Sequence, residues 1–354
     1  MILVLNAGSS SLKIEAFAPD LTSQVSGAVT RIGRDGVLSL GTAEQEVATT
    51  DHADALNQML AALAGAGYPL SSLTAAAHRV VHGGTILTQP ARITPTVIAA
   101  IESVVPLAPL HNPNNLAGIA ALQAAAPDLP QYCSFGTAFH ATNPEVAIRY
   151  AIPQTEHDAG IRRYGFHGLS YANMVAEFGD ALPDRLLALH LGNGASLCAI
   201  YQGQSIATSM GYSPLSGLTM GTRSGDIDGA AVLRMSAALG EAETDRMLNR
   251  NSGLQALAGD NHMKTLLDRD DGAARFAVEH FCYWAARHAG SAIVAMGGLD
   301  AVAFTGGIGE NAATVRDRIM DKLSCFGPVP VHIITADEEK QIARDAANLI
   351  AEGR

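Results

Sequence analysis

The sequence predicts an α/β protein of two domains, with mixed β-sheets covered by helices. Apolar runs bounded by glycine or asparagine turns are typical of strands, and they occupy residues 2–5, 12–17, 186–191, 196–201 and 301–305. Alanine-rich segments of helical period alternate with these runs, at residues 54–64, 96–104, 114–125, 229–239 and 273–296. A length of 354 residues, 48% of them hydrophobic, suffices for a buried core in each of two domains.

The charge balance excludes some classes of partner. The chain carries 34 acidic and 23 basic residues, a formal net charge of −11, which argues against a nucleic acid or an anionic membrane as partner. A small anionic substrate is not excluded, because such a substrate responds to a few local cations rather than to the average charge.

Cysteine usage and the N-terminal segment indicate the compartment. The four cysteines are far apart and form no C-x-x-C pair, which suits reduced thiols and argues against a structural zinc site. The apolar run at residues 2–5 follows no basic region, and no apolar stretch reaches the roughly 18 residues of a membrane helix. We therefore expect a soluble, unprocessed, cytoplasmic protein.

A sequence pattern that occurs twice divides the chain into halves. Residues 3–13 and 187–197 share one pattern: an apolar strand, a polar residue (Asn6 or His190), a glycine two positions later, small residues, and a second apolar strand. Two phosphate-facing hairpins, one in each half, would follow. Two unrelated turns are the alternative, because Gly, Ser and Asn favour turns in any case.

The first of these turns, at residues 6–13, combines a glycine, three serines and Lys13. Small residues let backbone N–H groups approach phosphate oxygens, serine hydroxyls add donors, and Asn6 could ligate or orient hydrated Mg²⁺. The spacing is not that of a Walker A loop. A solvated serine-rich turn is the alternative interpretation.

A candidate carboxylate site follows at residues 78–84, where Arg79 stands close to Val81 before a Gly-Gly pair. A guanidinium suits the head of a short carboxylate, and valine suits its methyl group. His78 and His82 have the spacing of a zinc helix, but the Val-Val and Gly-Gly context favours a strand and a turn.

Three histidines, His111, His167 and His190, each lie in a glycine or proline turn, and arginines precede the second of them at residues 162–163. Cations and imidazoles held near a transferring phosphoryl group stabilise its oxygens. A single histidine is more often structural, but three in such turns favour the catalytic interpretation.

Two glycine-rich segments complete the set. Residues 220–228 place Arg223 between glycines with carboxylates following, for which an exposed salt-bridged loop is the alternative. Residues 303–311 form a strand that runs into a glycine turn and a helix start, which suits a nucleotide phosphate or ribose. The spacing Gly307-x-Gly309-x-x-Ala312 also fits a loose dinucleotide fingerprint, but too few residues follow for such a domain.

In this order, the segments resemble the acetate kinase family, within the sugar-kinase, Hsp70 and actin superfamily, from Leu5 to about Asp345. The resemblance implies a duplicated ribonuclease-H-like fold with the active-site cleft between domains, a homodimer, and reversible phosphoryl transfer from ATP to acetate with Mg²⁺ or Mn²⁺. It places an N-terminal domain at residues 1–141 plus a returning helix at 338–354, and a nucleotide-binding domain at 142–337.

The resemblance also implies a role for individual residues. Arg79 and Arg223 would hold the carboxylate and phosphoryl groups, and His167 would stabilise the transition state. The remaining assignments are a further active-site histidine, His111; a methyl pocket of Val81, Leu110 and Pro214; metal-site residues Asn6 and Glu338; and nucleotide contacts from Ser9, Ser11, Lys13, His190, Gly192, Asn193, Gly194, Asp260, Gly306, Gly307, Ile308, Gly309 and Asn311.

One departure from the family pattern concerns catalysis. Where the family reads Phe-Asp-Thr-Ala-Phe-His, this chain has Gly136 in place of the aspartate. The acceptor carboxylate is already ionised at neutral pH, so the aspartate would orient a metal or an arginine rather than act as a base. Losing one electrostatic element commonly costs on the order of 10²–10³ in rate. A catalytically impaired nucleotide-binding homologue is therefore one alternative. Propionate or butyrate kinase is the other, because Val81 matches the acetate-type pattern but does not settle the chain length of the acid.

Other departures concern the nucleotide site and the periphery. The family's Asp-x-Arg near the adenosine corresponds here to residues 259–264, where Asp260 keeps the ribose role but no arginine follows. The chain is also shorter than typical members, and Gly229 replaces a usual proline. The missing arginine leaves the preferred nucleoside open, and the other two differences indicate trimmed peripheral helices or dimer-supporting segments.

Overall fold

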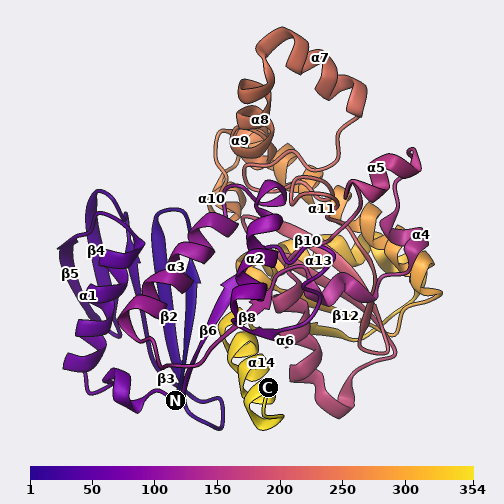
Figure 1. Ribbon diagram of the computed structural model, residues 1–354. Helices are drawn as coiled ribbons and strands as arrows, with labels where there is room; N and C mark the ends of the chain where they lie inside the picture. Colours follow the sequence, from indigo (N-terminus) through magenta and orange to yellow (C-terminus); the bar gives the residue numbers. More distant parts are fainter. The chain divides into compact units, whose positions relative to one another are not determined.

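The computed structural model describes all residues from Met1 to Arg354, and the chain divides into two compact units (Figure 1). The first unit comprises Met1–Phe139 and Asp337–Arg354, and the second comprises His140–Ala336. The C-terminal segment therefore packs with the N-terminal one.

The first unit is built on an eight-stranded sheet of order β5-β4-β3-β2-β1-β6-β8-β7. Its strands are β1 (Ile2–Ala7), β2 (Ser11–Phe17), β3 (Ser23–Thr30), β4 (Asp35–Leu40), β5 (Ala43–Ala48), β6 (Ala75–Val80), β7 (Ala91–Arg92) and β8 (Gln131–Phe135). The β1, β2 and β3 strands are antiparallel neighbours, whereas β1, β6 and β8 are parallel.

The second unit repeats this plan in a five-stranded sheet of order β11-β10-β9-β12-β13. Its strands are β9 (Arg185–Leu191), β10 (Ala195–Tyr201), β11 (Gln204–Thr208), β12 (Ala301–Thr305) and β13 (Val331–Ile333). Again the first three strands are antiparallel neighbours and the last two run parallel to the first. In both sheets the third, second, first, fourth and fifth strands of the shared plan lie side by side in that order and with the same directions: β3-β2-β1-β6-β8 in the first unit and β11-β10-β9-β12-β13 in the second. The predicted duplicated fold is therefore confirmed.

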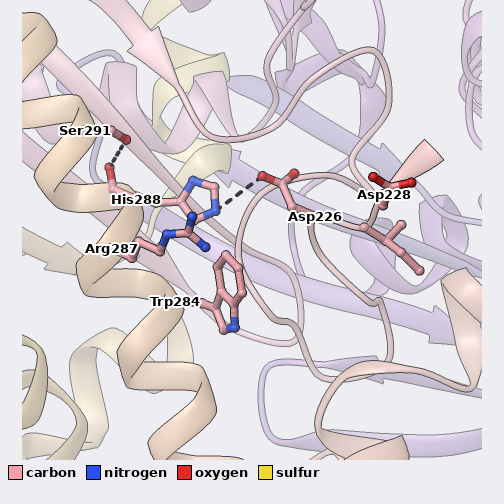
Figure 2. A pocket seen from close by; sticks show the side chains of 7 residues that line it. Asp226, Asp228, Trp284, Arg287, His288 and Ser291 are labelled. Atoms are coloured by element: carbon pink, nitrogen blue, oxygen red, sulfur yellow. Dashed lines mark hydrogen bonds and ion pairs between the residues drawn. The ribbon is translucent and has the colours of Figure 1, made fainter. Parts of the chain in front are cut away.

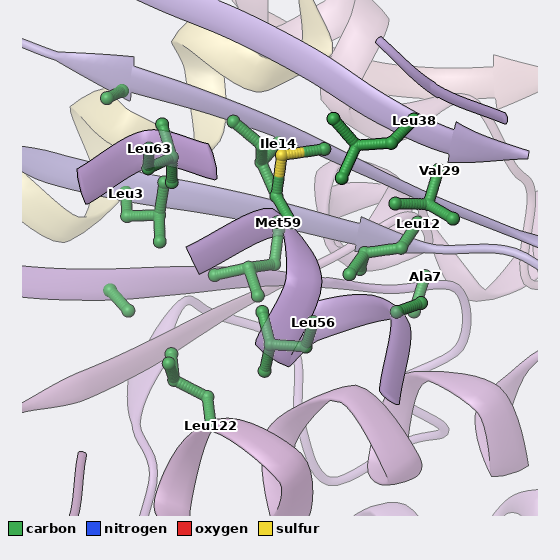
Figure 3. Close-up of a cluster of buried hydrophobic side chains, with 14 residues drawn as sticks. Leu3, Ala7, Leu12, Ile14, Val29, Leu38, Leu56, Met59, Leu63 and Leu122 are labelled. Atoms are coloured by element: carbon green, nitrogen blue, oxygen red, sulfur yellow. The ribbon is translucent and has the colours of Figure 1, made fainter. Parts of the chain in front are cut away.

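One apolar core of the first unit lies under helix α1 (His52–Gly65), as Figure 3 shows. Leu56, Met59 and Leu63 of this helix pack on Leu3 and Ile14 of the sheet. Residues at i, i+3 and i+7 share one helix face, and alternate strand residues share one sheet face. The apolar helix face and the apolar sheet face are therefore buried against each other. Asp51 caps the helix by accepting a hydrogen bond from the Asp54 amide at 2.9 Å.

Helix α14 (Glu338–Ala351) packs on β1, β6 and β8, while α2 (Pro95–Ser103) and α3 (Asn112–Ala125) pack together, with α3 also on β1 and β6. The Ser134 hydroxyl of β8 donates to Asp345 Oδ2 of α14 at 2.7 Å. Cys133 and Phe135, which alternate with Ser134, pack with Ile101 of α2 and Ile119 of α3. Because neighbouring strand residues point to opposite faces, α14 lies on one face of the sheet and α2 and α3 lie on the other.

The second unit contains the remaining helices, and its longest helix, α11, packs against β9, β10 and β11. Its helices are α4 (Glu145–Ile148), α5 (Gln154–Asp158), α6 (Gly168–Phe178), α7 (Gly229–Leu239), α8 (Glu241–Arg250), α9 (Gly253–Ala258), α10 (Met263–Asp268), α11 (Gly272–Met296), α12 (Gly306–Asn311) and α13 (Ala313–Leu323). Short 3₁₀ turns complete the chain: η1 (Leu70–Ser72), η2 (Val105–Leu107), η3 (Ala138–Thr142), η4 (Gly179–Ala181) and η5 (Ser324–Phe326).

The predicted strands and helices are all confirmed, with boundaries shifted by no more than a few residues. The strand favoured at residues 78–84 corresponds to the end of β6, whereas the sequence did not predict β3, β4, β5, β7, β8, β11 or β13. None of the helices combines the length and the apolar character that crossing a membrane requires. All four cysteines are free thiols, and only Cys325 is exposed.

Buried histidines give the fold a dependence on pH, and His78, His82 and His140 are buried in this way. His78 lies on strand β6, not on a zinc helix, with Nε2 2.8 Å from Gln131 Oε1. His140 lies 2.8 Å from Ser205 Oγ and 2.9 Å from the Phe166 carbonyl through its two ring nitrogens. Burial lowers the pKa of each from 6.5 to about 4, so both imidazoles are neutral in the folded protein.

We therefore expect acidification to destabilise the protein between pH 6.5 and 4. In this window the unfolded histidines bind protons that the folded ones do not, so stability is full above pH 6.5 and is lost as the pH falls. The loss is on the order of 3 kcal/mol per histidine at 1.36 kcal/mol per pKa unit. Urea unfolding at a series of pH values measures the free energy of unfolding, which His78→Gln should make less dependent on pH.

An unchanged dependence on pH in that variant would contradict the assignment of His78 as a buried neutral imidazole.

Candidate active site

The phosphate-facing turn predicted at residues 6–13 is the connection of the β1–β2 hairpin. The Gly8 amide donates to the Ser11 carbonyl at 2.8 Å and closes the turn, in which Ser9 is exposed. Asn6 and Lys13 are partners across the hairpin and so share one sheet face. His52, which the sequence did not predict, lies with Nε2 2.6 Å from the Gly8 carbonyl and fixes the turn from α1.

Arg79 meets the returning helix at the end of strand β6. Its Nε donates to Glu338 Oε2 at 2.8 Å, and the two side chains are only 18% and 16% exposed. Burial lowers the pKa of Arg79, but the charges of Glu338 and Glu339 outweigh this effect and raise it overall, so the guanidinium is firmly charged. We call Asn6, Arg79, Glu338 and Glu339 the Arg79 cluster, because Asn6 Nδ2 also donates to Glu339 Oε1, at 3.2 Å.

The Arg79 cluster offers oxygen donors of the kind that magnesium prefers. Asn6 carries an amide oxygen, and Glu338 and Glu339 carry carboxylates at the start of α14. The structure contains no group of three or more His, Cys, Asp or Glu side chains placed to hold a metal. Mg²⁺ usually keeps several waters and binds through one or two carboxylates plus substrate phosphates, so this donor set fits it. Glu339 was not predicted, although its place beside Glu338 in the sequence was a usable signal.

Of the acceptor-site residues predicted in the first unit, Val81 and Gly136 follow the ends of β6 and β8 directly. Val81 is buried, and its amide donates to Asn115 Oδ1 at 3.0 Å. The Gly136 amide donates to the Val80 carbonyl at 2.9 Å, and a Cβ at Gly136 would lie only 2.9 Å from the Val81 carbonyl oxygen. This position therefore accepts no side chain without a backbone shift. Leu110 is 55% exposed just before α3.

Two of the three predicted histidines come together in the second unit. His167 precedes α6 in the left-handed region, with φ of 58°, and its Nδ1 lies 2.8 Å from Ser196 Oγ. Its ring stacks on His190 with ring centroids 4.2 Å apart. A Cβ at Gly194 would lie 3.3 Å from Nε2 of His167 and 3.6 Å from Nη2 of Arg223. We call His167, His190, Gly194 and Arg223 the Arg223 cluster. His111 lies in the first unit, directly before α3.

Arg223 carries a positive charge that no carboxylate neutralises. Its Nη1 donates to the Pro214 carbonyl at 2.8 Å. Burial lowers the pKa of the guanidinium, yet an arginine remains protonated at neutral pH. The contact of Pro214 is thus made by its backbone, and its predicted place in a methyl pocket stays a prediction. A half-buried cation of this kind is suited to an incoming anion.

A cavity of about 920 Å³ adjoins the β9–β10 turn and lies between α10 and α12. Its lining residues are Gly192, Asn193, Asn261, His262, Met263, Lys264, Leu267, Asp268, Gly307, Ile308, Asn311 and Ala312. Gly306 starts α12 at φ of 79°, and a Cβ there would lie 2.7 Å from the Leu191 carbonyl, so only glycine brings α12 this close to β9. The volume is in the range of cofactor pockets.

The cavity includes five of the predicted nucleotide residues: Gly192, Asn193, Gly307, Ile308 and Asn311. Asp260 lies outside the lining. Its Oδ1 accepts from the amide and Nδ1 of His262 at 2.8 and 3.0 Å, and these bonds lower the pKa of the carboxyl. Lys264 and Asp268 of α10 line the cavity and were not predicted. The only feature of the sequence that could have indicated their place in the nucleotide site is their closeness to Asp260.

Comparison with known proteins gives a consistent result. A sequence model described as the acetokinase family matches residues 1–351. The acetate kinase of Streptomyces coelicolor is 40% identical over 395 aligned positions, which cover 99% of this chain and 97% of that protein. The crystal structure of Porphyromonas gingivalis acetate kinase has a TM-score of 0.93 and 33% identity, with 99% of each chain covered. That of a propionate kinase from Francisella tularensis has a TM-score of 0.92 and 35% identity, covering 97% and 98%.

Proposed function

The chain belongs to the acetokinase family, and on this premise we propose that it transfers the γ-phosphoryl group of ATP to acetate, giving ADP and acetyl phosphate. The reaction is reversible, uses Mg²⁺, and takes place in the cytoplasm. Its chemistry is mainly electrostatic, because phosphoryl transfer needs positioning and charge stabilisation more than covalent catalysis.

The Arg223 cluster is the observation that carries this proposal. It joins a guanidinium without a carboxylate partner to two stacked imidazoles, and Gly192 and Asn193 of the same β9–β10 turn line the cavity. The cavity holds the nucleoside, and Arg223 and His167 donate hydrogen bonds to the oxygens of the phosphoryl group as charge develops there. Ser196 holds Nδ1 of His167, which leaves Nε2 on the side of Gly194 and Arg223.

In the first unit, Arg79 binds the acetate carboxylate and Val81 contacts its methyl group. Glu338 keeps the guanidinium oriented through its hydrogen bond to Nε, which leaves the terminal nitrogens of Arg79 to pair with the carboxylate. Asn6, Glu338 and Glu339 would hold Mg²⁺. In the same unit, Lys13 and the serines of the β1–β2 turn would contact phosphate oxygens, and the metal would neutralise charge on such oxygens.

Acyl hydroxamate formation tests the proposed function directly. Purified protein is incubated with ATP, Mg²⁺ and acetate, propionate or butyrate, and hydroxylamine traps the acyl phosphate. We expect the highest kcat/KM with acetate, a lower value with propionate and the lowest with butyrate, and no product without ATP. A preference for propionate would favour the activity named for the Francisella tularensis relative. Absence of product with all three acids would refute the proposal.

Gly136 bears on whether the enzyme is impaired. We expect Gly136→Asp to destabilise the protein by about 1–3 kcal/mol without raising turnover, because its Cβ would overlap the Val81 carbonyl oxygen and force a backbone shift. Thermal unfolding and the hydroxamate assay measure the two effects. Gly136→Ala is the matched control, since it adds the same Cβ without a carboxylate. A large gain in rate with unchanged stability would instead identify wild type as an impaired kinase.

The surface of the second unit supports a homodimer. Helix α7 buries none of its residues and carries Leu233, which is 73% exposed; in Figure 1 it lies with α8 at the edge of the unit. Phe276, Tyr283 and Val294 of α11 are at least half exposed. Exposed apolar side chains are typical of an interaction surface where they gather in one patch. We propose that a second copy of the chain covers α7.

Leu233→Arg is expected to shift the protein from dimer to monomer, because a charge would replace a buried apolar contact at the interface. Size-exclusion chromatography with light scattering at micromolar concentration measures the mass. Arg234→Ala, at the neighbouring exposed position, serves as control for general effects on α7. A wild-type protein of monomer mass would contradict the proposed dimer.

A further inference from the structure

Asp226 closes the loop that carries Arg223. The Asp226 amide donates to the Gly217 carbonyl at 2.9 Å, and the Gly217 amide donates back to Asp226 Oδ1 at 2.7 Å. One backbone bond and one side-chain bond thus join the two ends of the segment 217–226. The side-chain bond exists only because residue 226 has an acceptor oxygen at this position.

The segment 217–226, which Asp226 closes, contains Arg223. Pro214, whose carbonyl accepts from Arg223 Nη1 at 2.8 Å, stands shortly before Gly217 in the chain. Gly225 has φ of 73°, and a Cβ there would lie 2.5 Å from the Leu218 carbonyl and 2.7 Å from that of Gly217. The two arms of the loop are therefore in direct contact, and the bond between Gly217 and Asp226 closes the loop in which Arg223 lies.

The second oxygen of Asp226 faces helix α11. His288 Nε2 lies 3.5 Å from Asp226 Oδ2, and Figure 2 shows the carboxylate directed from its loop toward this imidazole. Arg287 of the same helix stacks on Trp284, with its guanidinium carbon 4.6 Å from a ring centroid. Asp228, close in sequence, is used differently, because its Oδ1 accepts from the Ala230 amide at 2.7 Å and caps α7.

We propose that Asp226 is a positioning residue for Arg223: through the Gly217 amide it closes the loop 217–226 that contains Arg223 and so holds the guanidinium at the Pro214 carbonyl. The inference rests on the proposed function of Arg223 in phosphoryl transfer. It assigns Asp226 no contact with substrate. A misplacement of about 1 Å in a catalytic group costs on the order of 10²-fold in rate, so the effect of losing this tether is measurable.

Kinetics of two Asp226 variants test the tether. Asp226→Ala should lower kcat by about 10- to 100-fold with little change in KM for ATP, because the nucleoside cavity contains neither Asp226 nor Gly217. Asp226→Asn keeps an acceptor oxygen for the Gly217 amide and should restore most of the lost rate. Asp228→Asn, which keeps the α7 cap, is the matched control and should leave kcat unchanged.

A double variant separates positioning from general damage. If Asp226 acts through Arg223, Asp226→Ala should cause no further loss in an Arg223→Ala background, because residues acting as one unit are not additive. A wild-type kcat in Asp226→Ala, an equal fold-loss in both backgrounds, or an Asp226→Asn variant as slow as Asp226→Ala would each overturn the inference.

Amide hydrogen exchange tests the tether independently of activity. A wild-type protein that forms no acyl phosphate would remove the proposed function, whereas the tether would still be visible in the exchange of peptides covering 214–226. We expect faster exchange there in Asp226→Ala and wild-type exchange in Asp226→Asn. Unchanged exchange in Asp226→Ala would overturn the inference whatever the kinetic result.

Discussion

Replacement of Arg223 by alanine is expected to lower kcat for acetyl phosphate formation by about 10²–10³-fold, the usual cost of removing one preorganised charge from a transition state. The guanidinium lies beside Gly194 and His167, is held by the Pro214 carbonyl, and has no carboxylate partner in the structure. Its charge is therefore available to phosphoryl oxygens, and no other arginine occupies its place in the cluster. Steady-state hydroxamate assays at saturating ATP and acetate measure the loss.

Arg223→Lys is the control for this prediction. Lysine keeps the charge but not the planar fork that can bond the Pro214 carbonyl and an anion together, so we expect only partial recovery. The midpoint temperature of thermal unfolding should stay close to that of wild type in both variants, because neither substitution breaks an ion pair. Full activity in Arg223→Ala would remove Arg223 from the mechanism, and with it the main support for the proposed function.

Replacement of His167 by asparagine is expected to lower kcat by a similar factor, on the order of 10²–10³. His167 directs Nε2 toward Gly194 and Arg223, while Ser196 Oγ holds Nδ1 and His190 stacks on the ring. Asparagine is preferred to alanine in this test because the residue has φ of 58°, a left-handed conformation that asparagine adopts more easily. The fold should therefore survive while the imidazole is lost.

Ser196→Ala provides the matched control for His167. It removes the partner of Nδ1 but keeps the imidazole, so we expect a smaller loss of kcat than in His167→Asn. The nucleotide affinity of all three proteins, measured by calorimetry with ADP, should be similar, because neither side chain lines the cavity. An unchanged kcat in His167→Asn would show that Nε2 does not contact the transferring group.

Two strands show where local sequence preference is insufficient. Strand β6 begins with Ala75, Ala76 and Ala77, residues of high helix propensity, and becomes a strand because it pairs with β1 and β8 on both edges and is buried. Strand β5, Ala-Glu-Gln-Glu-Val-Ala at residues 43–48, is a polar edge strand without an apolar pattern. Tertiary pairing overrides local preference in both cases.

The sequence alone determined the two hairpins, the long helices, and the residue types of the site, because turns and periodic apolar patterns are local properties of the chain. The tertiary structure alone decided which of these residues meet. Arg79 and Glu338 are 259 residues apart in sequence, and Asn6 and Glu339 are 333 apart, yet each pair is hydrogen bonded. Such pairs arise only when the whole core has packed, as do the Pro214 carbonyl beside Arg223 and the backbone oxygen that occupies the space next to Gly136.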